Sequence, residues 1–165
     1  MSALISSRSF AAGTICETDY NSQTSDVTIY EIENGEVADE LHQFLSKNTS
    51  VEWGVVNAEE NGECYNFIGT NNNEKCSSVG GKIVNEGLLI DRVAHNHPGG
   101  NNTVSEEDHY GAIQYEQNNP NVQLFNYTNS NGYTRYSSGS EYLDNARAYQ
   151  RPSLPAIEII WPQKK

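Results

Sequence analysis

The stretch 95–108, HNHPGGNNTVSEED, separates a predicted strand from a predicted helix and carries three side chains of metal-binding type. His95 and His97 stand two residues apart at the end of the apolar run 88–95, and such side chains point to the same side of a strand. A Pro-Gly-Gly turn then ends the strand, and Asp108 falls in the first turn of the next helix. Two imidazoles and one carboxylate are zinc ligands that leave a fourth position for water, so the spacing predicts a catalytic zinc site.

Each part of this pattern has a simpler explanation when it is taken alone. Two histidines in a turn can be held by hydrogen bonds, and Ser105 followed three residues later by Asp108 is close to a helix capping box. The letters HNH also occur in a class of nucleases, but those nucleases spread their residues over two strands and a helix. The combination of HxHP with Ser105 and Asp108 favours the metal site, and Ser105 can cap the helix while Asp108 turns inward.

The same residues resemble the HxHP…SxxD motif of the JAMM (JAB/MPN-type) metallopeptidases. The variant HNHPGG…SEED is similar to the RadC-like branch and to the JAB-like domains of bacterial polymorphic toxins. The resemblance covers about residues 36–137. It implies an α+β, JAB/MPN-like single domain, with a mostly antiparallel sheet flanked by helices and Zn²⁺ as the cofactor.

The resemblance also implies a glutamate on an earlier strand, after the first helix. Glu52 occupies that place within the apolar segment 51–56, whereas three nearby glutamates fall in a predicted turn. In the family mechanism Glu52 is the general base and then acid for a metal-activated water, and Ser105 helps to steady the oxyanion. The alternative is that Glu52 only faces solvent on its strand.

Periodicity and turn residues predict an alternating order of elements, as in an α+β domain. The predicted helix over 36–48 has an apolar face, with Val37, Leu41, Phe44 and Leu45 at helical spacing. The other elements are strands at 27–32, 51–57, 65–70, 88–95, 122–127 and 133–137, a polar loop over 71–81, a helix over 105–117, and in the tail a helix over 141–149 and an edge strand over 157–161. We expect residues 1–25 to be a flexible leader or linker, and residues 26–165 to be the JAB/MPN-like metallopeptidase domain.

The charge of the chain is strongly acidic, with 22 acidic and 10 basic side chains and a formal net charge of −12. Such a surface repels phosphate backbones, so we expect no nucleic-acid partner. No apolar run approaches the roughly 20 residues that span a bilayer, and the first residues do not resemble a secretory signal. We therefore expect no membrane insertion.

The remaining cysteines and histidines carry weaker predictions. Cys16, Cys64 and Cys76 form no CxxC pair; Cys64 and Cys76 could pair across a hairpin, but buried free thiols are the simpler interpretation. His109 is expected on the surface of its helix, and His42 at the surface or at the edge of the core.

Together these features predict a zinc-dependent peptidase or isopeptidase that acts on a protein or peptide substrate. The resemblance to toxin domains suggests an interbacterial effector, secreted as the C-terminal part of a larger bacterial toxin and acting in the target cell, with a cognate immunity protein. The alternatives are a non-catalytic JAB/MPN partner-binding module and a RadC-like protein. The retained metal ligands argue against the first alternative, and the acidic charge argues against the second.

Overall fold

The computed structural model describes residues 27–72, 74 and 77–142, together with the backbone of three two-residue strands nearer the N-terminus. In chain order the elements are β1 (Ile5–Ser6), β2 (Thr14–Ile15), β3 (Thr24–Ser25), β4 (Thr28–Ile32), α1 (Gly35–Asn48), β5 (Trp53–Glu60), β6 (Glu63–Thr70), α2 (Val79–Asn85), β7 (Leu89–Asn96), α3 (Glu106–Asn118), β8 (Gln123–Thr128) and β9 (Gly132–Tyr136).

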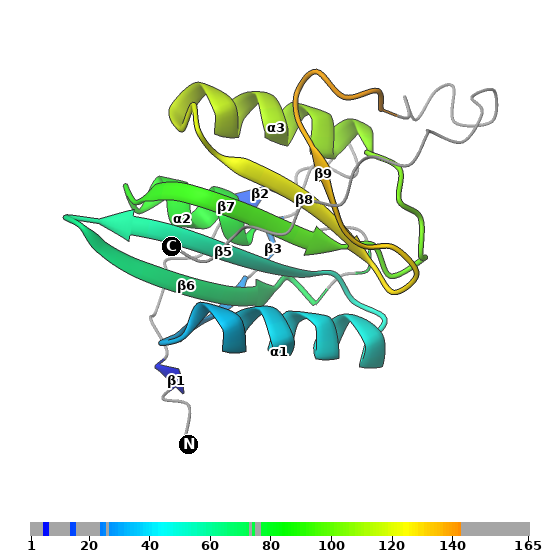
Figure 1. Cartoon of the computed structure of the whole chain (residues 1–165), viewed down its shortest axis with the longest axis horizontal. Helices are drawn as coiled ribbons and strands as arrows, with labels where there is room; N and C mark the ends of the chain where they lie inside the picture. Colours follow the sequence, from blue (N-terminus) through cyan, green and yellow to red (C-terminus); the bar gives the residue numbers. More distant parts are fainter. Residues whose placement is uncertain are drawn as a thin grey trace.

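One twisted sheet organises the domain, with strand order β1-β4-β6-β5-β7-β8-β9 (Figure 1). All neighbours in it are antiparallel except β7 and β8, which are parallel and joined through α3. A parallel pair needs such a crossover because the chain must return to the same end of the sheet. The α+β, mostly antiparallel architecture is confirmed.

Helices cover both faces of the sheet, with α1 on one face and α2 and α3 on the other (Figure 1). Adjacent residues of the central strand β5 divide between the two cores: Val55 packs on the α1 side and Val56 on the α2–α3 side. Ile68 and Phe67 of β6 divide in the same way. Because both faces are buried, these strands are nearly continuous apolar runs rather than alternating ones.

The predicted apolar face of α1 is only partly the buried one: Leu41 and Leu45 pack against the core as predicted, whereas Val37 is exposed. Ala38, His42 and Ser46, at a spacing of four residues, turn toward the sheet, whereas Phe44 is 60% exposed. His42 is wholly buried rather than at the surface or core edge, and it hydrogen-bonds the Tyr133 hydroxyl (2.7 Å) and the Trp53 carbonyl (3.1 Å). Hydrogen bonds therefore stabilise a polar residue where simple amphipathicity predicts an apolar one.

The predicted loop over 71–81 is wrong at its end, where α2 begins at Val79. Gly80 and Gly81 are poor helix formers, so the local sequence gives no helix signal. Packing overrides propensity here: a Cβ at Gly80 would lie 2.3 Å from the Tyr115 hydroxyl oxygen, so only glycine lets the two helices approach this closely.

Several predictions fall on residues that the structure does not describe. The expected tail helix and edge strand lie almost wholly or wholly beyond residue 142, and Cys16 and Cys76 also lie outside the described residues. Cys64 is exposed and free, so the prediction of a buried thiol is wrong for that residue. Within the segment expected to be a leader, β1 pairs with β4, and β2 pairs with β3. No helix among the described residues is long and apolar enough to cross a membrane.

Candidate metal centre

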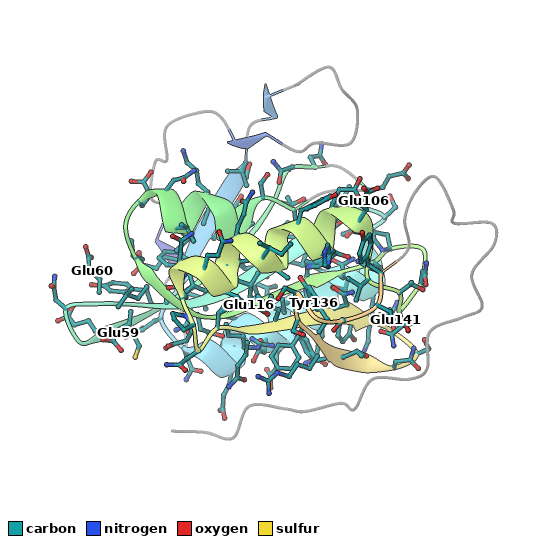
Figure 2. All side chains as sticks on the ribbon, turned by 90° about the horizontal axis from the view of Figure 1, so that it is seen from above. Glu59, Glu60, Glu106, Glu116, Tyr136 and Glu141 are labelled. Carbon is teal, nitrogen blue, oxygen red and sulfur yellow. The ribbon has the colours of Figure 1, made fainter. Side chains whose placement is uncertain are left out.

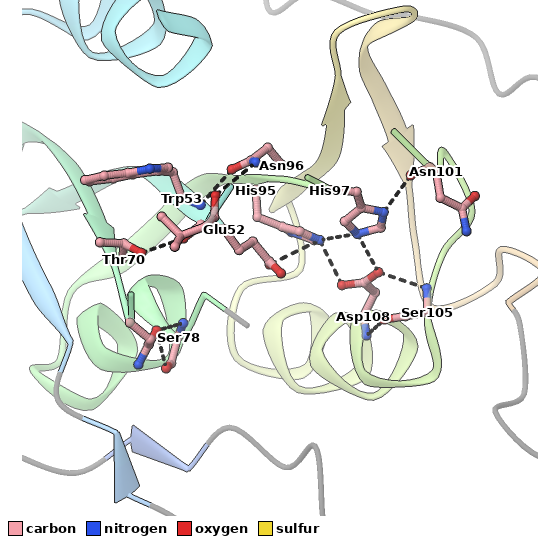
Figure 3. Close-up of polar contacts among 12 residues, drawn as sticks. Glu52, Trp53, Thr70, Ser78, His95, Asn96, His97, Asn101, Ser105 and Asp108 are labelled. Atoms are coloured by element: carbon pink, nitrogen blue, oxygen red, sulfur yellow. Dashed lines mark hydrogen bonds and ion pairs between the residues drawn. The ribbon is translucent and has the colours of Figure 1, made fainter. Parts of the chain in front are cut away.

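The parallel crossover places the two halves of the motif against each other. Strand β7 ends at Asn96, and α3 then runs back across one face of the sheet. The first turn of α3 therefore faces the end of β7 (Figure 3). His95 Nε2 lies 3.0 Å from His97 Nε2 and 2.9 Å from Asp108 Oδ1, and His97 Nε2 lies 3.3 Å from Asp108 Oδ2. The three predicted ligands thus converge into one group that could hold a metal ion.

The spacing of these atoms suits a tetrahedral zinc ion. Zinc ligands at about 2.0–2.1 Å from a tetrahedral ion lie about 3.3 Å from one another, close to the separations in this group. The His97 ring is also in a suitable tautomer: its Nδ1 donates to the Asn101 carbonyl (2.7 Å), which can only accept, so the lone pair of Nε2 points at the cluster. Two imidazole nitrogens and one carboxylate oxygen therefore fit zinc.

The electrostatics of the group favour a cation. Burial alone would raise the pKa of Asp108, but the two imidazoles beside it hold that pKa well below its usual range. Burial would likewise lower the pKa of His95, but the Asp108 carboxylate raises it to about 9. The site thus keeps a buried, ionised carboxylate that needs a positive charge beside it. A divalent metal ion can supply that charge in place of a protonated histidine.

The start of α3 fixes the orientation of Asp108. Ser105 caps the helix, its Oγ accepting from the Asp108 amide (3.0 Å), and its own amide donates to Asp108 Oδ2 (2.9 Å). The capping box and the metal cluster are therefore compatible, since Asp108 belongs to both.

Glu52 lies immediately before β5, which begins two residues later than the sequence predicts. Its side chain is buried, and Oε1 is 3.9 Å from His95 Nε2, so the carboxylate borders the cluster on the side away from Asp108 (Figure 3). Burial raises the pKa of Glu52 to about 7, although His95 and His97 act in the opposite direction.

The middle residue of the HNH triplet holds this segment in place and was not singled out from the sequence. Asn96 Oδ1 accepts from the Trp53 amide (2.6 Å), and its Nδ2 donates to the Val51 carbonyl (3.4 Å). Thr70 Oγ1 adds a bond to the Glu52 carbonyl (2.7 Å). Strand alternation gives the one available signal: between two ligands that face the site, the middle side chain must point to the other side.

A glycine opposite His95 lets the residues that lead into α2 lie close to the sheet. Gly54 pairs with His95 across β5 and β7, and a Cβ there would lie 2.5 Å from Ser77 Oγ. Any side chain at this position would displace the loop that leads into α2. The close approach of that loop to the sheet therefore depends on glycine.

The family model described as JAB-like toxin 1 matches residues 30–122 of the chain. The chain belongs to the JAB-like toxin 1 family. The match extends from β4 to the residue before β8 and includes the three cluster residues and Glu52. No curated protein and no solved structure gave a match.

In this JAB-like toxin domain the single histidine of α3 stands apart from the candidate metal cluster. His109 is half-buried rather than on the surface, and its ring stacks on Tyr142 with centroids 4.0 Å apart. The group that could hold a metal consists of His95, His97 and Asp108 without it.

Proposed function

We propose that this JAB-like toxin domain is a zinc-dependent peptidase or isopeptidase. The observation that carries the proposal is the buried Glu52 carboxylate, 3.9 Å from a ligand nitrogen of a group suited to zinc. A purely structural zinc site is closed by four protein ligands, whereas this group offers three and has a carboxylate beside it. The arrangement suits hydrolysis by an activated water.

The chain's own residues can then perform the proton transfers. Bound Zn²⁺ would supply a Lewis acid that lowers the pKa of water. Glu52, with its pKa near neutrality, takes a proton from the attacking water and gives it to the nitrogen of the leaving amine. Ser105 Oγ accepts from the Asp108 amide, which leaves its hydroxyl proton to donate to the developing oxyanion.

The first test separates metal binding from catalysis. Glu52→Gln keeps the size and burial of the side chain but removes the base, so we expect wild-type zinc content and loss of cleavage in a peptide-library screen. Glu60→Gln is the matched control, because Glu60 lies at the exposed tip of the β5–β6 hairpin. Figure 2 shows it at the opposite end of the molecule from Glu106, which stands two residues before Asp108. Cleavage by Glu52→Gln at the wild-type rate would contradict the assignment of the base.

We also propose that the domain acts as an effector inside a target bacterium, delivered as part of a larger secreted toxin. Membership of a toxin family supports this, and the net charge of −12 favours an immunity protein with a basic surface. Expression in the bacterial cytoplasm should arrest growth, and Glu52→Gln should not. Equal growth arrest by both proteins would show that toxicity does not depend on hydrolysis.

A further inference from the structure

We propose that Asn126 of β8 is a positioning residue that holds the His95 ring for metal binding. The inference rests on the proposed zinc function and adds a residue that lies outside the motif. It starts from an unexplained feature of the buried structure. Both side-chain amide atoms of Asn126 are buried without a hydrogen-bond partner among the described residues, and the side chain is 1% exposed.

A buried amide without a partner is unfavourable, so native proteins seldom keep one without a reason. Asn126 continues a strand of buried core residues: Leu124 packs in the core on the same face of the sheet, and Phe125 packs in the core on the other face. An isosteric leucine would suit such surroundings better. The presence of an amide here therefore points to a group that becomes its partner in the functional state.

The register of the sheet identifies that partner as His95. Asn126 lies opposite His95 in the parallel pair of β7 and β8, so the two side chains project from the same face of the sheet. That face is the one covered by α3, where His95 also makes an edge contact with the Tyr136 ring at 6.1 Å. Asn126 is thus the next side chain along the sheet from a predicted ligand.

The two histidines of the cluster differ in what supports them. His97 presents Nε2 to the cluster and has its Nδ1 held by the Asn101 carbonyl. His95 also presents Nε2 to the cluster, but its Nδ1 has no hydrogen-bond partner among the described residues. Histidine ligands of metals almost always donate their second nitrogen to an oxygen, which fixes both ring orientation and tautomer.

Asn126 supplies the missing oxygen. The terminal torsion of asparagine is broad, so the amide can turn to accept from His95 Nδ1, directly or through one water. Thr134 lies opposite Asn126 on β9, and its buried hydroxyl also lacks a partner, so it can accept from the Asn126 NH₂ group. A row from His95 through Asn126 to Thr134 would then satisfy all three side chains.

The test measures zinc affinity by competition with a chelator, which does not depend on catalysis. Asn126→Leu should weaken zinc binding by about 10–100-fold, while the metal-free protein unfolds at the same or a higher temperature. Asn126→Asp, which keeps an acceptor oxygen, should restore the affinity. Thr134→Val removes only the far end of the row, so we expect a smaller loss of zinc affinity than for Asn126→Leu. Asn119→Ala is the control: it truncates a buried asparagine at the other end of β7, so we expect unchanged zinc affinity.

A spectroscopic measurement separates positioning from a general structural effect. In the zinc-loaded wild type the Nδ1 proton of His95 should give a slowly exchanging NMR signal, and Asn126→Leu should lose it. If Asn126→Leu does not fold, Asn126→Ala takes its place with the same expected loss. Wild-type affinity and a retained signal in the variant would overturn this inference alone, whereas absence of zinc binding by the wild type would overturn the proposed function as well.

Discussion

At the scale of single residues, Asp108 joins secondary structure to chemistry. One of its oxygens closes the capping box of α3, and the other faces His95. The capping box that begins α3 therefore also orients the Asp108 carboxylate. A residue in such a double role can be found from sequence, because both roles depend on neighbours only three residues away.

Asn96 is predicted to matter for the rate but not for the metal. Asn96→Ala removes two hydrogen bonds that hold the segment before β5, so Glu52 should move and kcat should fall by about 10–100-fold. Zinc affinity should stay unchanged, because these two hydrogen bonds of the Asn96 side chain go to Trp53 and Val51 and not to a cluster residue.

Asn119→Ala is the control for this variant. Asn119 is also a buried asparagine that accepts from a strand amide, that of Ile90, but it does so at the other end of β7. The Asn119→Ala variant should have a lower free energy of unfolding in denaturant titration and an unchanged kcat. Equal kcat losses in the two variants would mean that Asn96 acts only through global stability.

The residues of the site differ in how far the sequence alone could predict them. His95, His97 and Asp108 lie within 14 residues, so their spacing was sufficient to predict a common site. Glu52 required a family resemblance, because it lies just before β5, 43 residues before His95. Asn126 was not predicted, since its relation to His95 depends on the register of two strands.

At the scale of elements, α2 shows where propensity and packing disagree. Gly80→Ala would gain up to about 1 kcal/mol of helix propensity, but the new Cβ would meet the buried Tyr115 hydroxyl oxygen at 2.3 Å. Overpacking costs about 1–3 kcal/mol, so we expect net destabilisation. Gly111→Ala in α3 should stabilise instead, because its nearest contact is an ordinary 3.8 Å. Urea titrations that give both variants the same sign would contradict this.

The attachment of α1 to the sheet should make stability depend on pH through His42. The pKa of His42 is lowered from 6.5 to about 3, mainly by burial; the hydrogen bond to the Trp53 carbonyl opposes this shift, and the nearby charges of Arg92 and His95 add to it. Between these two pKa values the unfolded chain binds a proton that the folded chain does not. The free energy of unfolding should therefore fall as the pH drops from about 6.5 toward 3, by up to about 1.4 kcal/mol per pH unit, and should be insensitive to His42 above pH 7.

The measurement is the pH dependence of urea unfolding for the wild type and His42→Leu. Leucine does not titrate, so the slope due to His42 should be absent from the variant, although the lost hydrogen bond to the Tyr133 hydroxyl will lower its overall stability. The difference between the proteins isolates His42 from other buried groups such as Asp39, whose pKa is raised by burial. Parallel profiles would show that folding does not lower the pKa of His42.

At the scale of the whole molecule, the sequence predicts the elements better than their arrangement. Six main strands and the two long helices were predicted within a few residues, because each leaves a local pattern of apolar residues. The strand order was not predicted, because β5 pairs with both β6 and β7, and the parallel strands β7 and β8 are separated in the chain by a helix. Those contacts depend on residues far apart in the chain.

The parallel crossover is the global feature that creates the site. It brings the end of β7 and the first turn of α3 together and places β8, with Asn126, beside His95. The remaining strands form the scaffold, and the segment just before the neighbouring strand β5 carries Glu52.

The most direct test of this account is the zinc content of the purified domain, measured by plasma mass spectrometry after dialysis. We predict about one zinc per chain for the wild type, loss of that zinc in His97→Ala and in Asp108→Ala, and full retention in Glu107→Gln, which alters an exposed carboxylate next to the ligand. Zinc binding that is absent from the wild type, or that survives both alanine substitutions, would contradict the central claim.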